Sequence, residues 1–485
     1  MSNTVLLKNS VLYTAGNLLL KAFSFFLLPL YTTFLSTDEY GIINLSSSFY
    51  TLSSSILILC LQYAVIRFYT DLKYDIKKVA KMYGTVICFI VIASVIFILI
   101  CLLFHSFLCK SLFDGIPFFP IVFLSIFIAV FMGLYTVYQD ILKGMQMAKK
   151  SILFSYLFFF LMLAINIVTV VVFNLGATGV ILSTLGVYII MVVIMFIDLY
   201  RHNLIVICID TKMLGNLLKY SLPILPHNLS FNIQFFTTRV IINKYLSLSG
   251  LGLYSLAYQF GSISDVILSS VQSAFQPWFY TEMKNKCDYN TIAKLTYSLI
   301  WFYGFFFLVL GLYSQEAVML MSTPTYHEAW IYIPFIIFST SLKIPLYFLI
   351  NFMYFDKAKT KYIFISTIVG CLISIMFTFK FVPYYGIFGA ILADIVALIF
   401  RFLIVVYFVR DIVYKVYSIK RMYLLSLLSM IFLGFGIYPS FVFYPYNFEL
   451  SNLLIKSVIL LLYIIFAIYS NRYIVFDVLS KYIKR

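Results

Sequence analysis

Amide, hydroxyl and amino side chains recur at helical spacing inside a long apolar stretch near the start of the chain. Asn17 and Lys21 lie four residues apart, and the polar positions around them follow at intervals of three or four, which places them on one face of a helix. An ammonium group on such a face can bind an anion, and an amide can bind hydroxyl groups. The complete stripe consists of Ser10, Thr14, Asn17, Lys21 and Ser24.

Three further apolar stretches carry polar groups of the same kind. Asn228, Asn232 and Arg239 share one helical face of the first, and Lys343 lies on the polar face of another. Asp265 lies in a polar stripe of its own and is an acid that can pair with one of the cations or bind a coupling ion. The structural alternative for each residue is an ion pair or hydrogen bond that holds helices together.

The sequence lacks the common motifs of catalysis and metal binding. It has no GxxxxGK[ST] phosphate-binding loop, its four His show no HExxH spacing, and its seven Cys never lie closer than eight residues apart. We therefore predict that the chain is not an enzyme and uses no metal or other cofactor.

The composition requires that most of the chain lies in lipid. Of 485 residues, 63% are apolar and 11% are charged, against about 45–50% and about 25% in a soluble domain. Runs of about 20 apolar residues predict an all-α polytopic membrane protein with fourteen transmembrane helices. The expected spans are residues 10–34, 42–66, 82–104, 117–139, 152–173, 178–198, 218–242, 253–276, 295–313, 329–352, 362–380, 386–409, 422–440 and 452–470.

The basic residues predict the orientation of these spans. With a cytoplasmic N-terminus, 26 of the 34 Lys and Arg lie in or beside cytoplasmic segments, Arg67 among them, and only Lys110, Lys244 and Lys380 lie in the opposite loops. The positive-inside rule then predicts that both termini are cytoplasmic. The net charge of +16 is explained by this asymmetry, so we expect no nucleic-acid partner.

The chain contains an internal repeat. Residues 6–73 align with residues 217–284 at a constant offset of 211, with 19 identities in 68 positions. We predict two six-helix lobes, 1–210 with helices one to six and 211–415 with helices seven to twelve, followed by two C-terminal helices and a cytoplasmic tail at 416–485. Because six is even, the lobes are parallel repeats, an arrangement found in transporters.

Several segments of the chain resemble those of a known protein family. The segment from Leu35 to Gly41, its counterpart from Leu246 to Gly252, and the segments 218–223 and 142–150 are similar to those of bacterial lipid-linked oligosaccharide flippases of the Wzx type. These flippases form the polysaccharide-transport branch of the MOP (MATE-like) exporter superfamily. The resemblance covers essentially the whole chain.

The resemblance implies a polysaccharide-biosynthesis transporter of the bacterial inner (cytoplasmic) membrane. Its substrate would be an undecaprenyl-pyrophosphate-linked oligosaccharide, such as an O-antigen or capsule repeat unit, flipped from the cytoplasmic to the outer leaflet by alternating access. Membrane lipid surrounds the protein, while coupling to H+ or Na+ and a polysaccharide polymerase partner remain open. The expected substrate-binding residues are Lys21, Arg239, Lys343, Arg67, Asn17, Asn228 and Asn232, with Asp265 for ion coupling.

Two other functions are compatible with a polytopic membrane protein. An ion-coupled multidrug exporter of the same superfamily binds cations, so it would need deep acids rather than Lys21 and Arg239. A membrane-embedded polysaccharide polymerase or ligase would need an active site in an outer loop, and the longest predicted outer loops have about 12 to 15 residues.

Overall fold

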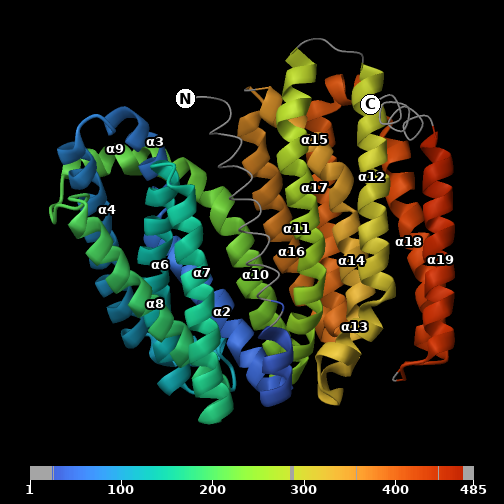
Figure 1. The fold of residues 1–485 in the computed structure, drawn as a ribbon, viewed down its shortest axis with the longest axis horizontal. Coiled ribbons are helices and arrows are strands. Elements are labelled where there is room, and N and C mark those ends of the chain that lie inside the picture. The colour runs from blue at the N-terminus through green and yellow to red at the C-terminus, as the bar shows by residue number, and fades with distance from the viewer. Residues whose placement is uncertain (1–24, 26, 285–288, 357, 446, 473–485) are drawn as a thin grey trace. The chain divides into compact units, whose positions relative to one another are not determined.

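The computed structural model describes residues 25, 27–284, 289–356, 358–445 and 447–472, and every regular element among them is a helix (Figure 1). The predicted all-α class is therefore confirmed. Contacts between residues divide the chain into two compact units, unit 1 from Met1 to Gly252 and unit 2 from Leu253 to Arg485. The predicted lobe limits at residues 210 and 415 stay a prediction.

Unit 1 consists of helices packed around one central helix. Its described elements are α2 (Thr37–Ile58), α3 (Leu61–Leu72), α4 (Ile76–Leu103), α5 (His105–Phe107), η1 (Leu108–Leu112), η2 (Phe118–Val122), α6 (Phe123–Gly144), α7 (Ala148–Asn166), η3 (Ile167–Val172), α8 (Gly176–Arg201), α9 (Thr211–Ser221), η4 (Leu222–Ile224) and α10 (Leu225–Tyr245). Helix α6 packs against α2, α3, α4, α7 and α8. Its residues Val137, Tyr138 and Ile141 are buried in one cluster with Met82 and Tyr83 of α4.

The loop before α9 is held to α4 by an ion pair. Lys81 Nζ lies 2.8 Å from Asp210 Oδ2, and Asp210 Oδ1 accepts the N–H of Met213 at 2.9 Å, which caps α9. The Lys81 ammonium and this N–H together hold the pKa of the Asp210 carboxyl below its ordinary value.

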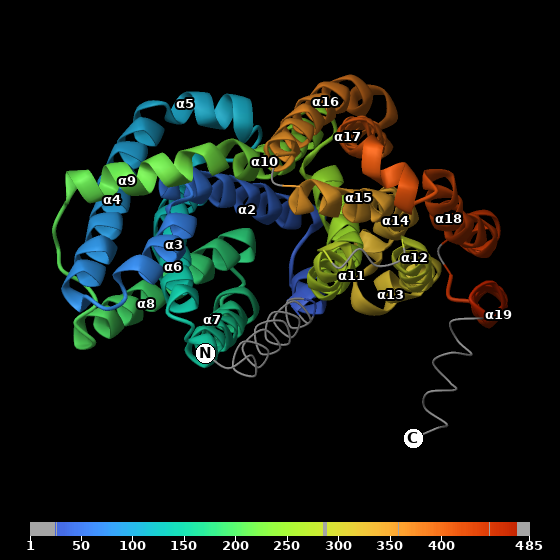
Figure 2. The ribbon, with the colours of Figure 1, turned by 90° about the horizontal axis from the view of Figure 1, so that it is seen from above.

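Unit 2 is a second helical bundle. Helix α11 (Leu248–Lys284) begins in unit 1 and continues into unit 2, where it is followed by α12 (Tyr289–Leu312), α13 (Ser314–Met321), η5 (Pro324–Tyr332), α14 (Ile333–Ser341), α15 (Lys343–Phe355), η6 (Thr360–Tyr362), α16 (Ile363–Tyr385), α17 (Ile387–Val416), α18 (Ile419–Val442) and α19 (Leu450–Ser470). Helix α12 packs against α14, α17, α18 and α19, and α16 lies beside α17 (Figure 2).

Eleven of the fourteen predicted spans are helices long and apolar enough to cross a membrane. Ten of them meet the length and hydropathy requirement as a single helical stretch each, and the eleventh meets it as the bent pair α2 and α3. The first predicted span lies almost entirely outside the described residues. The two that remain correspond to α10 and α11, whose polar stripes lower their hydropathy. These two helices carry the candidate site residues Asn228, Asn232, Arg239 and Asp265.

Three of the predicted spans are broken helices. The seventh is interrupted at η4, which contains Pro223, as its prolines predict. The second bends by 41° at Leu59 and Cys60, which both have positive φ, and the tenth is interrupted at Leu342. The sequence analysis did not predict these last two breaks. The bend at Leu59 and Cys60 contains no Gly or Pro, whereas Pro345, three residues after Leu342, cannot donate a backbone hydrogen bond to the Ser341 carbonyl.

The two copies of the repeat make equivalent backbone contacts where α2 and α11 begin. Ser36 Oγ accepts the N–H three residues later at 3.2 Å, and Ser247 Oγ does the same at 3.0 Å. A Cβ added to Gly41 would lie 2.2 Å from the carbonyl oxygen of Leu248, and one added to Gly252 would lie 2.1 Å from that of Thr37. Thr37 and Leu248 are also 211 residues apart, so the repeat is present in the packing as well as in the sequence.

Replacement of Gly252 by alanine should therefore destabilise the protein. The new methyl group meets a backbone carbonyl that cannot rotate away, and overpacking of this kind costs about 1–3 kcal/mol. Thermal unfolding of the purified variant in detergent measures the change. Gly186→Ala is the matched control, because a Cβ there has no neighbour within 4 Å, and its melting temperature should not fall. Equal melting temperatures for Gly252→Ala and Gly186→Ala would contradict the close approach.

Candidate functional site

In unit 1, two predicted amide residues face the broken helix pair α2 and α3. The Asn228 side chain of α10 donates to Cys60 Sγ at 3.4 Å and to the Tyr63 hydroxyl at 3.3 Å. One turn further along, Asn232 Nδ2 donates to Ser55 Oγ at 2.9 Å. The polar stripe of α10 therefore lies against the bend in the second span, where Leu59 and Cys60 leave the α-helical conformation.

Arg239 continues this stripe into the interior of unit 1. Its side chain is buried, with 3% of the residue exposed. Its Nη1 donates to the carbonyl of Phe235 at 3.3 Å, and the guanidinium carbon lies 3.4 Å from the centre of the Phe235 ring. Tyr40 of α2 lies within electrostatic reach of the guanidinium. An aromatic face stabilises a cation without neutralising it, so the unit keeps a permanent positive charge here.

The other predicted cations of the first half are placed differently. Arg67 lies near the exposed end of α3, where its guanidinium forms an ion pair with Asp71 at 2.8 Å and donates to Thr70. It is not part of the contacts of Asn228, Asn232 and Arg239. Lys21 and Asn17 lie outside the described residues, so their predicted roles stay predictions.

In unit 2, Asp265 of α11 pairs with Lys343 of α15. Lys343 Nζ lies 3.1 and 3.3 Å from the two carboxylate oxygens. The side chains are 20% exposed for Lys343 and 34% for Asp265, so the pair is within reach of a ligand. Lys343 is the first residue after the break at Leu342. Of the two predicted roles of Asp265, the structure shows pairing with a cation, whereas binding of a coupling ion stays a prediction.

Helix α17 adds a second acid and a second base to this cluster, Asp394 and Arg401. From the sequence, both lie near helix ends and are expected to be structural, so neither is among the predicted site residues. Asp394 accepts a hydrogen bond from Ser339 Oγ at 2.9 Å and lies within electrostatic reach of Lys343. Arg401 lies within electrostatic reach of Asp394 and of Tyr347, and positions 394 and 401 are seven residues apart on one helical face. The four charged side chains sum to zero.

Two turns along the same helix pair, the amides of Gln272 and Asn351 meet. Gln272 Nε2 donates to Asn351 Oδ1 at 2.6 Å and to the Tyr347 carbonyl at 3.3 Å. Beside them Phe275 and Phe348 pack edge to face, with ring centres 5.0 Å apart. The contact between α11 and α15 therefore has an aromatic side and a polar side, and the polar side carries the charged pair and the amide pair.

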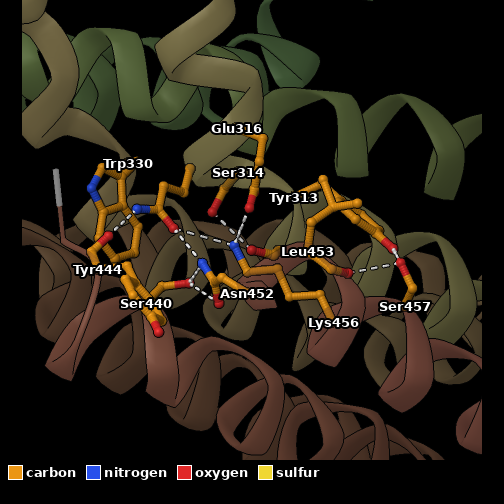
Figure 3. Close-up of polar contacts among 12 residues, drawn as sticks. Tyr313, Ser314, Glu316, Trp330, Ser440, Tyr444, Asn452, Leu453, Lys456 and Ser457 are labelled. Carbon is orange, nitrogen blue, oxygen red and sulfur yellow. Dashed lines mark hydrogen bonds and ion pairs between the residues drawn. The ribbon is translucent and has the colours of Figure 1, made fainter. Parts of the chain in front are cut away.

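A third polar network joins the last two helices to the rest of unit 2 (Figure 3). Lys456 of α19 is fully buried, and its Nζ lies 2.6 and 2.9 Å from the carboxylate oxygens of Glu316 in α13. Gln315 accepts hydrogen bonds from Lys456 at 3.3 Å and from Asn452 at 3.2 Å, and Asn452 also donates to Ser440 of α18. These groups satisfy one another, which is expected of a structural network.

The arrangement can bind anions and polar uncharged groups. In unit 1 Arg239 supplies a guanidinium, in unit 2 Lys343 supplies an ammonium paired with Asp265, and the asparagine and glutamine amides of each unit supply neutral donors and acceptors. Within the part of the chain that the structure describes, no group of three or more His, Cys, Asp or Glu side chains could hold a metal ion.

Comparison with known proteins shows the family of the chain and solved structures with the same fold. The profile of a family described as polysaccharide biosynthesis protein matches residues 6–283. A protein of the Lsg locus of Haemophilus influenzae is 23% identical over 401 residues, which cover 79% of this chain and 95% of that protein. Of the solved structures, the lipid II flippase MurJ in its inward closed conformation aligns with a TM-score of 0.71 at 16% identity, over 96% of this chain and 100% of that one.

A second solved structure has the same architecture. The inward-facing conformation of a multidrug resistance MATE family transporter of the MOP superfamily aligns with a TM-score of 0.56 at 14% identity, over 81% of this chain and 96% of that one. At such identities the similarity establishes the fold alone. The MOP or MATE-like architecture expected from the sequence is thereby confirmed.

Proposed function

We propose a function from the premise that the chain belongs to the polysaccharide biosynthesis protein family, whose profile matches more than half of it. The chain is a multi-pass membrane transporter of this family and not an enzyme. Its proposed activity is to flip undecaprenyl-pyrophosphate-linked oligosaccharide units from the cytoplasmic to the outer leaflet of the bacterial inner membrane, with both termini in the cytoplasm. The observation that carries the proposal is the buried guanidinium of Arg239 in α10, a helix expected to cross the membrane, on the same polar stripe as Asn228 and Asn232.

The proposed substrate explains why such a helix keeps a cation. A pyrophosphate group is anionic and strongly hydrated, so its passage through a membrane requires positive charge to replace water. A guanidinium binds phosphate oxygens with two parallel hydrogen bonds, and an ammonium binds them as a point charge. In this proposal Arg239 and Lys343, together with Lys21 and Arg67, engage the pyrophosphate or acidic sugars. The polyprenyl chain stays in lipid.

Amide groups take the role of sugar ligands. Asn17, Asn228 and Asn232 can each donate and accept hydrogen bonds, which suits hydroxyl groups of a sugar. Asn228 and Asn232 bond to Cys60, Tyr63 and Ser55, which are single, neutral contacts that a substrate can replace at low cost.

Alternating access in this proposal is coupled to H+ or Na+ through Asp265. If Asp265 serves only to hold α15 in place through Lys343, then transport by the Asp265→Asn variant should still be accelerated by the gradient as in the native protein. If Asp265 couples transport, Asp265→Asn should lose this acceleration, by at least about tenfold in rate under the gradient, because an amide cannot take up a proton or pair with a sodium ion as a carboxylate does. Flipping in proteoliposomes with an imposed H+ or Na+ gradient measures this.

The test of the proposed function is deletion of the gene in its own host. Loss of surface glycan, with accumulation of the lipid-linked repeat unit in the cytoplasmic leaflet, is expected, and the cloned gene should restore export. A partner such as a polysaccharide polymerase acts after this step, so its loss should leave lipid-linked units in the outer leaflet. Unchanged surface glycan combined with altered drug sensitivity would refute the proposal and favour a multidrug exporter.

A further inference from the structure

We infer that the amide pair Gln272 and Asn351 is a binding subsite for an uncharged sugar substituent that both donates and accepts a hydrogen bond, an acetamido or a hydroxyl group. The inference rests on the proposed transport of a glycan and names two residues that were not among the predicted substrate ligands. It starts from atoms whose hydrogen-bonding capacity is unused.

Each amide of the pair has one polar atom that makes no hydrogen bond within the described part of the chain. Gln272 Nε2 donates to Asn351 and to the Tyr347 carbonyl, while Gln272 Oε1 and Asn351 Nδ2 are buried and make no hydrogen bond to any described residue. Asn351 as a whole is fully buried. Buried amide groups are nearly always paired, so an acceptor and a donor left free side by side require an explanation.

The two free atoms form a matched recognition set. Oε1 accepts a hydrogen bond and Nδ2 donates one, and a hydrogen bond joins the two side chains that carry them. A secondary amide has one N–H to donate and one C=O to accept, and a hydroxyl group can both donate and accept. Neither a phosphate, which only accepts, nor an ammonium, which only donates, satisfies both atoms.

The surroundings of the pair suit a sugar. Ser269 and Ser273 of α11 share a helical face with Gln272, and both are exposed although they lie in a helix assigned to the membrane. Their hydroxyls bond to carbonyls of their own helix. The charged pair Asp265 and Lys343 lies seven to eight residues away along the same two helices, about 10–12 Å at 1.5 Å per residue, so one substrate could place a charged group and a sugar on the two sites.

The Phe275 and Phe348 rings keep the pair in position. They pack edge to face with ring centres 5.0 Å apart, one turn from the amides along each helix, and Phe279 and Phe352 repeat this contact at 4.9 Å. These aromatic contacts would remain if the amides were replaced by apolar side chains of similar size, so binding can be tested without loss of the helix pair.

The experiment measures disaccharide binding to the full-length protein in lipid nanodiscs. Chitobiose and cellobiose are the probes, because they differ only in carrying acetamido or hydroxyl groups at the same carbon. Ligand-observed NMR titration gives each dissociation constant. Asn351→Leu and Gln272→Met should each weaken binding about tenfold, the scale of one lost neutral hydrogen bond with an unsatisfied partner. Gln276→Met, whose amide is satisfied by Tyr280 at 2.6 Å, should bind as the native protein does.

The outcomes separate the subsite from the proposed function. If the two variants weaken the binding of chitobiose but not that of cellobiose, the ligand group is an acetamido group. If they weaken the binding of both sugars equally, the ligand group is a hydroxyl. Dissociation constants that do not change in either variant, or no binding of either sugar to the native protein, would overturn the subsite. If Asn351→Leu does not fold, Gln272→Met decides. A pair that binds sugar in a protein whose deletion leaves glycan export intact would retain the subsite and refute the flippase.

Discussion

Replacement of Arg239 by alanine should reduce glycan export by about 10- to 100-fold while the protein remains folded in the membrane. Arg239 is a buried cation of unit 1, and its guanidinium donates to the carbonyl of Phe235 and lies over the Phe235 ring. A charge-assisted hydrogen bond contributes about 1.5–3 kcal/mol, and 1.4 kcal/mol corresponds to a factor of ten. Surface glycan and the level of membrane protein, measured together, check the expectation.

Two variants sharpen this experiment. Arg239→Lys keeps the positive charge but loses the planar pair of N–H donors. If the guanidinium binds phosphate through two parallel hydrogen bonds, this variant should export more glycan than Arg239→Ala and less than the native protein. Arg410→Ala is the control for loss of an arginine, because Arg410 is exposed and its neighbour is Asp411. Native levels of glycan in Arg239→Ala would show that the buried charge does not engage the substrate.

The sequence predicts the helices of this protein better than it predicts their breaks. Apolar runs of about 20 residues and their punctuation locate eleven spans because lipid imposes one length and one composition on every such helix. Pro223 marks one break because proline removes a backbone donor. Pro345 accounts for the interruption at Leu342 in the same way, because it cannot donate to the Ser341 carbonyl. The bend at Leu59 and Cys60 contains no Gly or Pro, so no residue type marks it in the sequence.

The sequence indicated which residue types line the candidate site, but it did not indicate which side chains contact one another. Helical spacing placed Asn228, Asn232 and Arg239 on one face, and the structure shows the two asparagines bonded to α2 and α3. The partner of Asp265 is 78 residues away, at Lys343. Contacts over such a separation depend on how helices pack, and one sequence limits the choice to a few deep cations without selecting among them.

The pairing of Glu316 with Lys456 could not be predicted from the sequence either. Glu316 lies in the first turn of α13, within a segment that the sequence analysis treated as an outer loop. A carboxylate in a loop is usually solvated, and nothing in the sequence indicates that it is covered by α19. The structure buries it beside a lysine that is 140 residues away.

Replacement of Lys456 by methionine should therefore destabilise unit 2 by about 3–5 kcal/mol, because removal of one partner leaves the other charge buried and uncompensated. The double variant Glu316→Gln/Lys456→Met removes both charges and should recover most of this loss, since well-packed uncharged residues often replace a buried ion pair at little cost. Thermal unfolding in detergent compares the two variants. Lys78→Met, which removes an exposed lysine paired with exposed Asp75, should change stability by less than about 1 kcal/mol.

The comparison of single and double variants also determines what the pair does for the last two helices. Gln315, Asn452 and Ser440 remain hydrogen-bonded to one another when both charges are gone, so the double variant should keep α18 and α19 in place. If it instead unfolds as readily as Lys456→Met, the charges themselves specify the docking of these helices. A Lys456→Met protein as stable as the native one would mean that Glu316 finds water in place of its partner, and the burial of this pair would then be wrong.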